Sequence, residues 1–359
     1  MQRPPLPAGL HTLADHEALA RQNLPAPTWA YVAGGAGDGH TLQANAQAWQ
    51  RVGLAPRVLP ASRTLDTRIG LWGHTHPTPL LVAPMAQHGA VHPDAERATA
   101  LAASALGVGL VLSAQSQTPM EVVARLYQPG SGMGPLWFQL YPHPDKAWVL
   151  ELALRAEASG YQALVLTVDA PVQGVRDAER RAGWTGVPGQ ALAHPEPPRP
   201  PGTGAAALLA QAWTWDDVAW LQSRVGLPLL LKGITHPADA RQACQLGVSG
   251  VVVSNHGGRV LDTVRATAEV LPAVVQAVQG GCTVLVDGGI RRGTDVVKAL
   301  AMGAQAVMVG RPVLFGLANA GATGVAHVLR TLLDETQAAM ALCGCAAVPA
   351  ANQDLLHTP

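Results

Sequence analysis

Eight short apolar runs recur between residues 79 and 311, and each run ends in polar residues or glycine. Runs of this length, rich in Val and Leu, are typical of strands that are buried on both faces of a parallel sheet. The runs cover residues 80–85, 109–113, 136–141, 163–169, 227–233, 250–256, 283–288 and 306–311.

Stretches with helical spacing lie between the runs, at 93–106, 146–159, 237–246 and 294–302. Eightfold alternation of strand and helix predicts an α/β fold, specifically a closed (β/α)8 TIM barrel. A doubly wound open sheet would show the same alternation and is the alternative.

Two segments fall outside this repeat. We expect one domain over 1–359, with an N-terminal extension at 1–78 and the barrel at 79–345. The extension is expected to be helical at 10–23 and 28–49. Segment 183–211 is so rich in proline that it cannot be a regular helix or strand. Because it follows the fourth strand, we expect a mobile loop at the carboxyl-terminal face.

The charges argue against a polyanionic partner. Lys and Arg number 24, Asp and Glu also number 24, and charged residues make up only 13% of the chain. We therefore expect neither nucleic acid nor a membrane surface as a partner. There is no signal-peptide pattern at the N-terminus and no unbroken apolar stretch of membrane-spanning length, which indicates a cytoplasmic location.

The four cysteines do not form a disulfide framework in so long a chain. Cys343 and Cys345 form a Cys-x-Cys pair that could bind a metal or be redox-active, or could simply pack near a helix end. The histidines lack metal-ligand spacing, so no metal site is expected.

Charged side chains gather where the predicted strands end. The carboxyl ends of barrel strands carry the site in this fold, and Asp169, Lys232, His256 and Arg259 all follow or close a strand. Such groups are costly to bury alone, so they form either an ion-pair network or a functional site. Glycine and arginine follow the last two strands, at 287–291 and 310–311, where barrels often bind phosphate.

The segment Ser254-Asn-His-Gly-Gly-Arg-Val-Leu-Asp262 resembles the signature of the FMN-dependent α-hydroxy acid oxidases and dehydrogenases, the family of glycolate oxidase and lactate oxidase. Val260 stands where that signature has glutamine. Further motifs follow in the family's order, among them Phe138-Gln-Leu-Tyr141 and Asp287-Gly-Gly-Ile-Arg291. The resemblance implies FMN as cofactor and the oxidation of an L-2-hydroxy acid to the 2-oxo acid.

The resemblance also implies roles for the residues around the substrate. His256 matches the base that takes a proton from the substrate, and Asp169 matches the carboxylate that orients this histidine. Arg259 matches the residue that grips the substrate carboxylate, with Tyr31 and Arg176 beside it. The alternatives are that Tyr31 only packs in a helix and that Arg176 points to solvent.

Other matching residues are implied to surround the reacting atoms and the flavin. Tyr141 matches a tyrosine near the substrate hydroxyl. Lys232 matches a lysine beside flavin N1 and O2, where its charge would stabilise the anionic reduced flavin. The residues implied to bind the cofactor are Pro84, Met85, Ala86, Ser113, Gln139, Thr167, Lys232, Ser254, Asp287, Gly288, Gly289, Arg291, Gly310 and Arg311.

The electron acceptor is expected to be O2, giving H2O2. Ala86 favours an oxidase, and the short Pro-rich loop argues against membrane docking. The alternatives are a quinone-linked dehydrogenase of lactate type and an FMN-dependent isomerase on the same barrel. Whether the substrate loses a proton or a hydride from Cα stays open, and the family implies a homotetramer.

Three amide side chains bear on the substrate tail. Gln87, Gln115 and Gln173 each follow a strand. At the positions of Gln115 and Gln173, members of the family often carry apolar residues. Unpaired amides should reject a purely apolar substituent, so we expect a polar rather than an aryl or alkyl tail. The alternative is that these amides face solvent or the loop.

Overall fold

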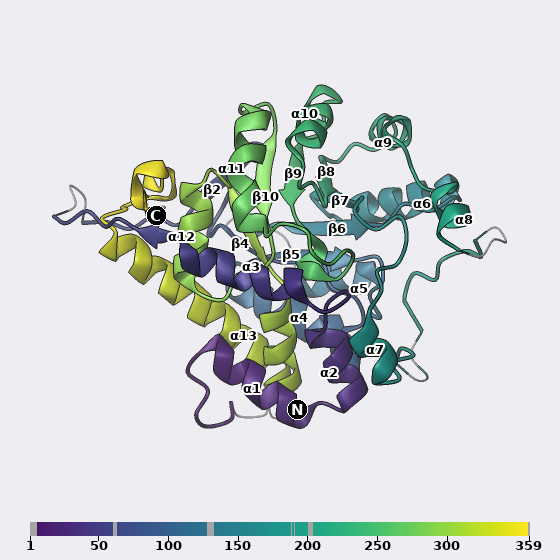
Figure 1. Ribbon diagram of the computed structural model, residues 1–359, viewed down its shortest axis with the longest axis horizontal. Coiled ribbons are helices and arrows are strands. Elements are labelled where there is room, and N and C mark those ends of the chain that lie inside the picture. The colour runs from purple at the N-terminus through teal and green to yellow at the C-terminus, as the bar shows by residue number, and fades with distance from the viewer. Residues whose placement is uncertain are drawn as a thin grey trace.

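The computed structural model describes residues 6–59, 63–127, 133–187, 189, 191–199 and 204–357. Eight parallel strands close into a barrel in the order β10-β11-β4-β5-β6-β7-β8-β9, which confirms the TIM barrel and excludes the open sheet (Figure 1). The strands are β4 (Leu80–Val82), β5 (Gly109–Ser113), β6 (Leu136–Leu140), β7 (Ala163–Thr167), β8 (Leu229–Lys232), β9 (Gly250–Val253), β10 (Thr283–Val286) and β11 (Ala306–Val309).

The strands are mainly apolar because both of their faces are buried, and most of their polar residues lie at or near the carboxyl ends. Side chains such as Val111, Trp137 and Met308 fill the barrel interior, while their neighbours along each strand pack against the surrounding helices. A hairpin of β2 (Ile69–Leu71) and β3 (His74–His76) contributes its apolar residues to the interior cluster. This hairpin closes the amino end of the barrel and leaves the carboxyl end for a site.

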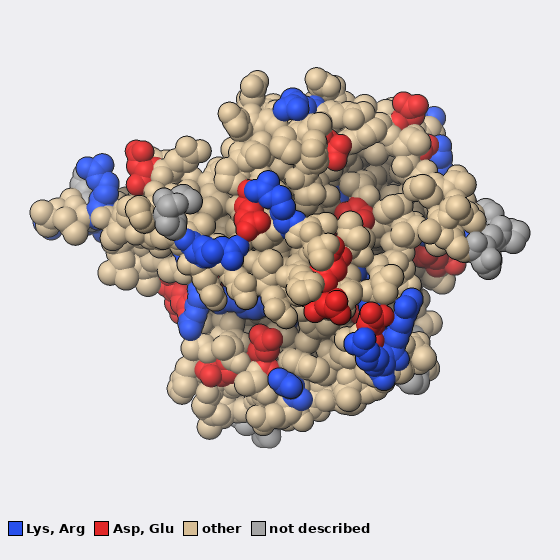
Figure 2. All heavy atoms as spheres, viewed as in Figure 1, with Lys and Arg blue, Asp and Glu red and all other residues tan. Residues whose placement is uncertain are grey.

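Helices cover the outside of the barrel, and the four helical stretches expected between the strands are confirmed. Figure 2 shows Lys, Arg, Asp and Glu interspersed on a largely uncharged face. The helices that follow strands or their loops are α4 (Ala95–Ala105), α5 (Met120–Tyr127), α6 (Lys146–Ala158), α9 (Trp215–Gln222), α10 (Pro237–Gln245), α11 (Thr267–Val278), α12 (Gly293–Ala301) and α13 (Arg311–Leu342).

The N-terminal extension contains α1 (Leu13–Asn23), α2 (Ala26–Ala33) and α3 (His40–Arg51), so the single helix expected over 28–49 is wrong. Glycines interrupt it between 34 and 39, and two of them have left-handed φ angles of +53° and +79°. Asp262 holds the interruption in place by accepting backbone N–H groups from residues 38, 40 and 41. At this break the carbonyl of Gly34 accepts hydrogen bonds from Arg259 and Arg311.

The Pro-rich segment is irregular over much of its described length, but it ends in a short helix, α8 (Ala205–Leu209), which corrects the expectation of no regular structure. Residues 188, 190 and 200–203 lie outside the described residues, and the mobility of the loop stays a prediction. His194 within it is buried and accepts the backbone N–H of Met120, so part of the segment packs on the barrel. The short α7 (Asp177–Arg181) precedes it.

Helix α13 is the one described helix that is long and apolar enough, by length and composition, to cross a membrane. Its backbone leaves helical geometry at Ala320 and Gly321, and 67% of its most apolar window is buried inside the protein. It packs against α1, α4 and α12, so its apolar residues are buried by neighbouring helices of the same fold. The chain ends in β12 (Leu356–His357), which pairs with β1 (Gly53–Leu54).

A buried histidine pair joins α1 to α13, and it predicts acid sensitivity. His16 is fully buried with its Nε2 atom 2.9 Å from Nδ1 of His327. Burial, and then the neighbouring charge of His327, lower the pKa of His16 to about 4. The unfolded chain therefore binds a proton at His16 between roughly pH 6.5 and 4 that the folded chain does not, so stability falls as the pH falls through this window.

Lowering the pH from 7.5 to 4.5 should reduce the unfolding free energy of both proteins. We expect the reduction to be about 2 kcal/mol smaller in His16→Gln than in the parent protein. Urea unfolding of both proteins at the two pH values measures this difference. Equal losses in the two proteins would show that the histidine pair does not carry the acid sensitivity.

Candidate active site

Two adjoining cavities of about 1120 and 160 Å³ open at the carboxyl ends of the barrel strands. The side chains common to both walls are Tyr31, Gln115, Tyr141, Arg176 and His256. Four of these five were predicted as site residues, and their elements lie far apart along the chain. The fold therefore brings them to one place.

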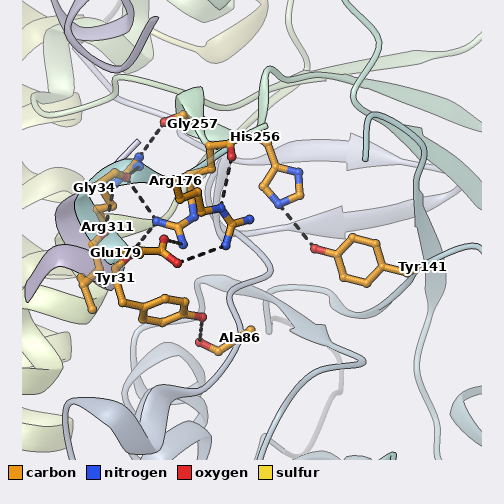
Figure 3. A network of polar contacts seen from close by, with 11 residues as sticks. Tyr31, Gly34, Ala86, Tyr141, Arg176, Glu179, His256, Gly257 and Arg311 are labelled. Carbon is orange, nitrogen blue, oxygen red and sulfur yellow. Dashed lines mark hydrogen bonds and ion pairs between the residues drawn. The ribbon is translucent and has the colours of Figure 1, made fainter. Parts of the chain in front are cut away.

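His256 lies in a hydrogen-bonded row between Asp169 and Tyr141. Its Nδ1 atom is 3.0 Å from Oδ1 of Asp169. Figure 3 shows its other ring contact, in which Nε2 lies 3.4 Å from the Tyr141 hydroxyl. A carboxylate accepts and cannot donate, so Nδ1 carries the proton, and the lone pair of Nε2 can accept from the Tyr141 hydroxyl. The backbone of His256 has a φ of +57°, a strained value for a residue other than glycine.

The pKa shifts of the three side chains in this row suit a His256 that acts as a base. Burial, and then the charge of Lys232, lower the pKa of His256, and these effects outweigh the hydrogen bond to Asp169. Burial alone would raise the pKa of Asp169, but its hydrogen bond and charge interaction with His256 leave the pKa lowered. Burial raises the pKa of Tyr141, which stays a neutral phenol. At neutral pH the row therefore consists of a carboxylate, a neutral imidazole and a phenol.

Two arginines lie beside this row and share one glutamate. Arg259 donates to Glu179 Oε1 at 2.9 Å, and Arg176 lies 3.7 Å from Glu179 Oε2 while donating to the carbonyl of Arg259 (Figure 3). The Tyr31 ring covers the Arg259 guanidinium at 5.0 Å. Burial, and then the charge of Arg176, lower the pKa of Arg259. Arg176 is thus turned into the site rather than toward solvent.

Lys232, Ser254 and Asp287 form a second polar group under the smaller cavity. The Lys232 ammonium donates to Ser254 Oγ at 2.9 Å and lies 3.3 Å from Asp287 Oδ2. The other carboxylate oxygen of Asp287 is buried and has no hydrogen-bond partner among the described residues. A buried acceptor without a donor indicates that a ligand hydroxyl belongs there.

Arg311 and Arg291 give the smaller cavity a positive wall. Arg311 donates to the carbonyls of Val32, Gly34 and Gly257 at 3.1, 2.7 and 2.9 Å. A Cβ atom on Gly257 would lie 2.7 Å from Arg311 Nη1, so a larger residue here would displace the guanidinium.

No carboxylate of the described chain forms an ion pair with either arginine. Burial lowers the pKa of Arg311 to about 9, and the charges of Arg259 and Arg291 add to the shift. Part-buried cations without a carboxylate partner among the described residues favour an anionic ligand such as a phosphate.

Most of the residues predicted to bind the cofactor line these cavities. Ser113 and Gln139 are buried and bonded to each other at 3.0 Å, and the cavity walls described here do not include them. Ser254 likewise contacts the site through Lys232. Thr167 lines the larger cavity, and those on the smaller one are Pro84, Met85, Ala86, Lys232, Asp287, Gly288, Gly289, Arg291, Gly310 and Arg311.

Glu179 and Trp184 were not predicted. Glu179 is three residues after Arg176 on α7, a spacing that could have signalled an ion pair. Trp184 stacks on the Tyr31 ring with centroids 4.5 Å apart, and nothing in the sequence pattern pointed to that contact.

A family model of FMN-dependent dehydrogenases matches residues 20–358. The chain belongs to this family. An L-lactate oxidase of Nostoc sp. is 45% identical over 96% of this chain and 97% of its own length. A glycolate oxidase of Spinacia oleracea is 41% identical over 92% and 91%. A solved structure of mandelate oxidase with (S)-2-phenylpropionate has a TM-score of 0.88 at 40% identity, covering 97% and 98% of the two chains.

The cofactor of this family is FMN, and the residues present fit it. The partnerless oxygen of Asp287 suits a ribityl hydroxyl, and the unpaired cations Arg291 and Arg311 suit the phosphate. Lys232, at the end of β8, would help to hold the cofactor, and its charge would favour the anionic reduced form. A bound FMN would therefore supply both the donor that Asp287 lacks and the anion that the two arginines lack.

Proposed function

We propose that this protein oxidises an L-2-hydroxy acid to the 2-oxo acid and transfers the electrons to O2, producing H2O2. The observation that carries the proposal is a neutral, oriented histidine on the wall shared by the two cavities, with two part-buried arginines beside it. The names of the relatives, lactate and glycolate oxidase, support the same reaction class. FMN, when bound, takes two electrons from the substrate and returns them to O2.

The chain's own residues position the substrate and move its proton. Arg259 and Arg176 bind the substrate carboxylate, because guanidinium groups match carboxylates in geometry and charge. The Glu179 carboxylate cancels one of the two positive charges, so the pair carries a net single charge. That balance suits a substrate with one carboxylate at this position.

His256 Nε2 accepts the proton, and Asp169 stabilises the imidazolium that results. Tyr141, a neutral phenol 3.4 Å from that nitrogen, can donate a hydrogen bond to the substrate hydroxyl oxygen. The Lys232 charge favours the anionic form of the reduced cofactor. Each group acts in the protonation state that its surroundings favour.

The acceptor is tested by turnover with L-lactate under air. The proposal predicts that O2 is consumed and H2O2 appears in equal amounts. Reduced enzyme that persists in air for minutes but is reoxidised at once by a soluble quinone would instead establish the quinone-linked dehydrogenase. No contact among the described residues favours the isomerase.

We also propose that the substrate tail is polar. Gln87, Gln115 and Gln173 line the larger cavity, and Gln115 lies on the wall shared with the smaller one. The alternative stated for these amides holds in part, because the amide nitrogen of Gln115 donates to Glu196 of the Pro-rich loop at 3.2 Å and Gln173 is exposed. A polar tail can bond to the Gln115 oxygen, whereas an apolar tail would desolvate it without compensation.

Replacing Gln115 by leucine should shift the preference toward apolar tails. We expect the ratio of kcat/KM for L-mandelate to that for L-glycerate to rise by about tenfold or more. Gln245→Leu, at an exposed position on α10, is the matched control and should leave the ratio unchanged. The tail proposal fails if the parent enzyme already prefers mandelate and long-chain 2-hydroxy acids to polar ones.

The homotetramer and the cytoplasmic location also remain proposals. Sedimentation of the purified protein near four times the chain mass of 37.2 kDa would support the tetramer. A species at the chain mass itself would exclude it.

A further inference from the structure

Two cysteine sulfurs touch at the end of the barrel opposite the active site. Cys244 is in the last turn of α10, and Cys282 immediately precedes β10. Their Sγ atoms are 2.8 Å apart, closer than two sulfurs that merely pack together. The sulfur–sulfur bond of a disulfide is about 2.05 Å long, so bonding requires a movement of less than about 1 Å.

The surroundings of the two thiols differ. Cys282 is buried, with 9% of its surface exposed, whereas Cys244 is only partly buried. The backbone at Gly281 lies against Cys244, since a Cβ atom there would be 3.8 Å from its Sγ. Burial, and then the contact with Cys244, raise the pKa of Cys282. A small oxidant can therefore reach Cys244 first, with Cys282 already in contact behind it.

We propose that Cys244 and Cys282 form an oxidant-sensitive pair that hydrogen peroxide converts to a disulfide. The Cys244 thiolate attacks one peroxide oxygen, giving a sulfenic acid and, with a proton, one water. The Cys282 sulfur then attacks the sulfenic sulfur, and the hydroxyl leaves with the thiol proton as a second water. Two electrons pass from the thiols to the peroxide, and one sulfur–sulfur bond forms.

The bond would link the end of α10 to the start of β10. The closed loop contains β9, the His256 and Arg259 segment and α11. A cross-link over a loop of this length stabilises mainly by restricting the unfolded chain. Cys282 is roughly 16 Å along the chain direction from Asp287 at the other end of the strand, so activity should not change.

Peroxide is the product in the proposed function, so the biological setting of this pair rests on that proposal. The test does not, because it uses added peroxide on resting holoenzyme without substrate. A failure of the thiol pair and a failure of the oxidase proposal are therefore distinguishable.

The experiment treats purified holoenzyme with excess H2O2, removes the excess with catalase, then denatures and alkylates the protein for peptide mass mapping. We expect two of the four cysteines to escape alkylation, as a cross-linked peptide pair two hydrogens lighter than the free thiols. A phosphine reductant should restore both. The melting temperature should rise by about 3 °C or more in the parent.

Variants separate this pair from the other cysteines. Cys343→Ser is the matched control, since Cys343 and Cys345 are both buried beyond α13, and it should behave as the parent does. Cys244→Ser, at the more exposed position, should show no cross-link and no rise in melting temperature. The proposal is overturned if all thiols are still alkylated after peroxide, if Cys244 becomes sulfinic acid while Cys282 stays reduced, or if Cys343 and Cys345 are the pair lost.

Discussion

Replacement of His256 by alanine is expected to lower kcat/KM for L-lactate by roughly 10² to 10⁴, the usual contribution of a positioned general base. His256 Nε2 is the acceptor that its bond to Asp169 orients, and no other neutral base lies in the described row. FMN should still bind, because the phosphate and ribityl contacts expected from Arg311, Arg291 and Asp287 do not involve the imidazole.

The measurement is the rate of anaerobic flavin reduction by L-lactate in a stopped-flow instrument, with the flavin content recorded for each protein. His74→Ala, at an exposed position in the β2–β3 hairpin, is the control and should reduce at the parent rate. A His256→Ala protein that carries flavin and is reduced at the parent rate would remove His256 from the mechanism.

Replacement of Arg259 by lysine is expected to lower kcat/KM by about 10² to 10³, although the charge is kept. The guanidinium donates to two backbone carbonyls and to Glu179 at once, and its plane lies over the Tyr31 ring. An ammonium cannot reproduce these contacts while also binding a carboxylate with two parallel bonds. The loss therefore reflects geometry rather than charge.

Steady-state kinetics with L-lactate, together with thermal melting of the holoenzyme, distinguish this effect from misfolding. Arg265→Lys is the matched control because Arg265 is largely exposed and pairs with Glu269 on the surface. It should retain the parent kcat/KM. If Arg259→Lys melts like the parent and stays within tenfold of its kcat/KM, Arg259 does not grip the substrate as proposed.

The barrel could be predicted because strands buried on both faces leave continuous apolar runs, and their polar ends mark the site. Residues such as Asp169, Lys232 and His256 were recognisable because each closes or follows such a run. The break between α2 and α3 was missed, since helical spacing continues on both sides of the glycines. It depends on Asp262, which is more than two hundred residues away.

Contacts set by tertiary packing left little or no signal in the sequence. Glu179 was overlooked because its main partner, Arg259, lies eighty residues further along the chain. The approach of Cys244 to Cys282 spans 38 residues and depends on how α10 packs against α11 and β9. The sequence pattern identifies which residues lie at the carboxyl end of the barrel. It does not identify which of their side chains contact one another there.

The central claim is that this barrel holds FMN beside a base and a carboxylate clamp. The direct test is the visible spectrum of the purified protein, first anaerobically with L-lactate and then after air is admitted. The account predicts a yellow protein whose flavin absorbance is bleached by the substrate and returns in air. A colourless protein that takes up no added FMN, or a flavin that no 2-hydroxy acid bleaches, would contradict it.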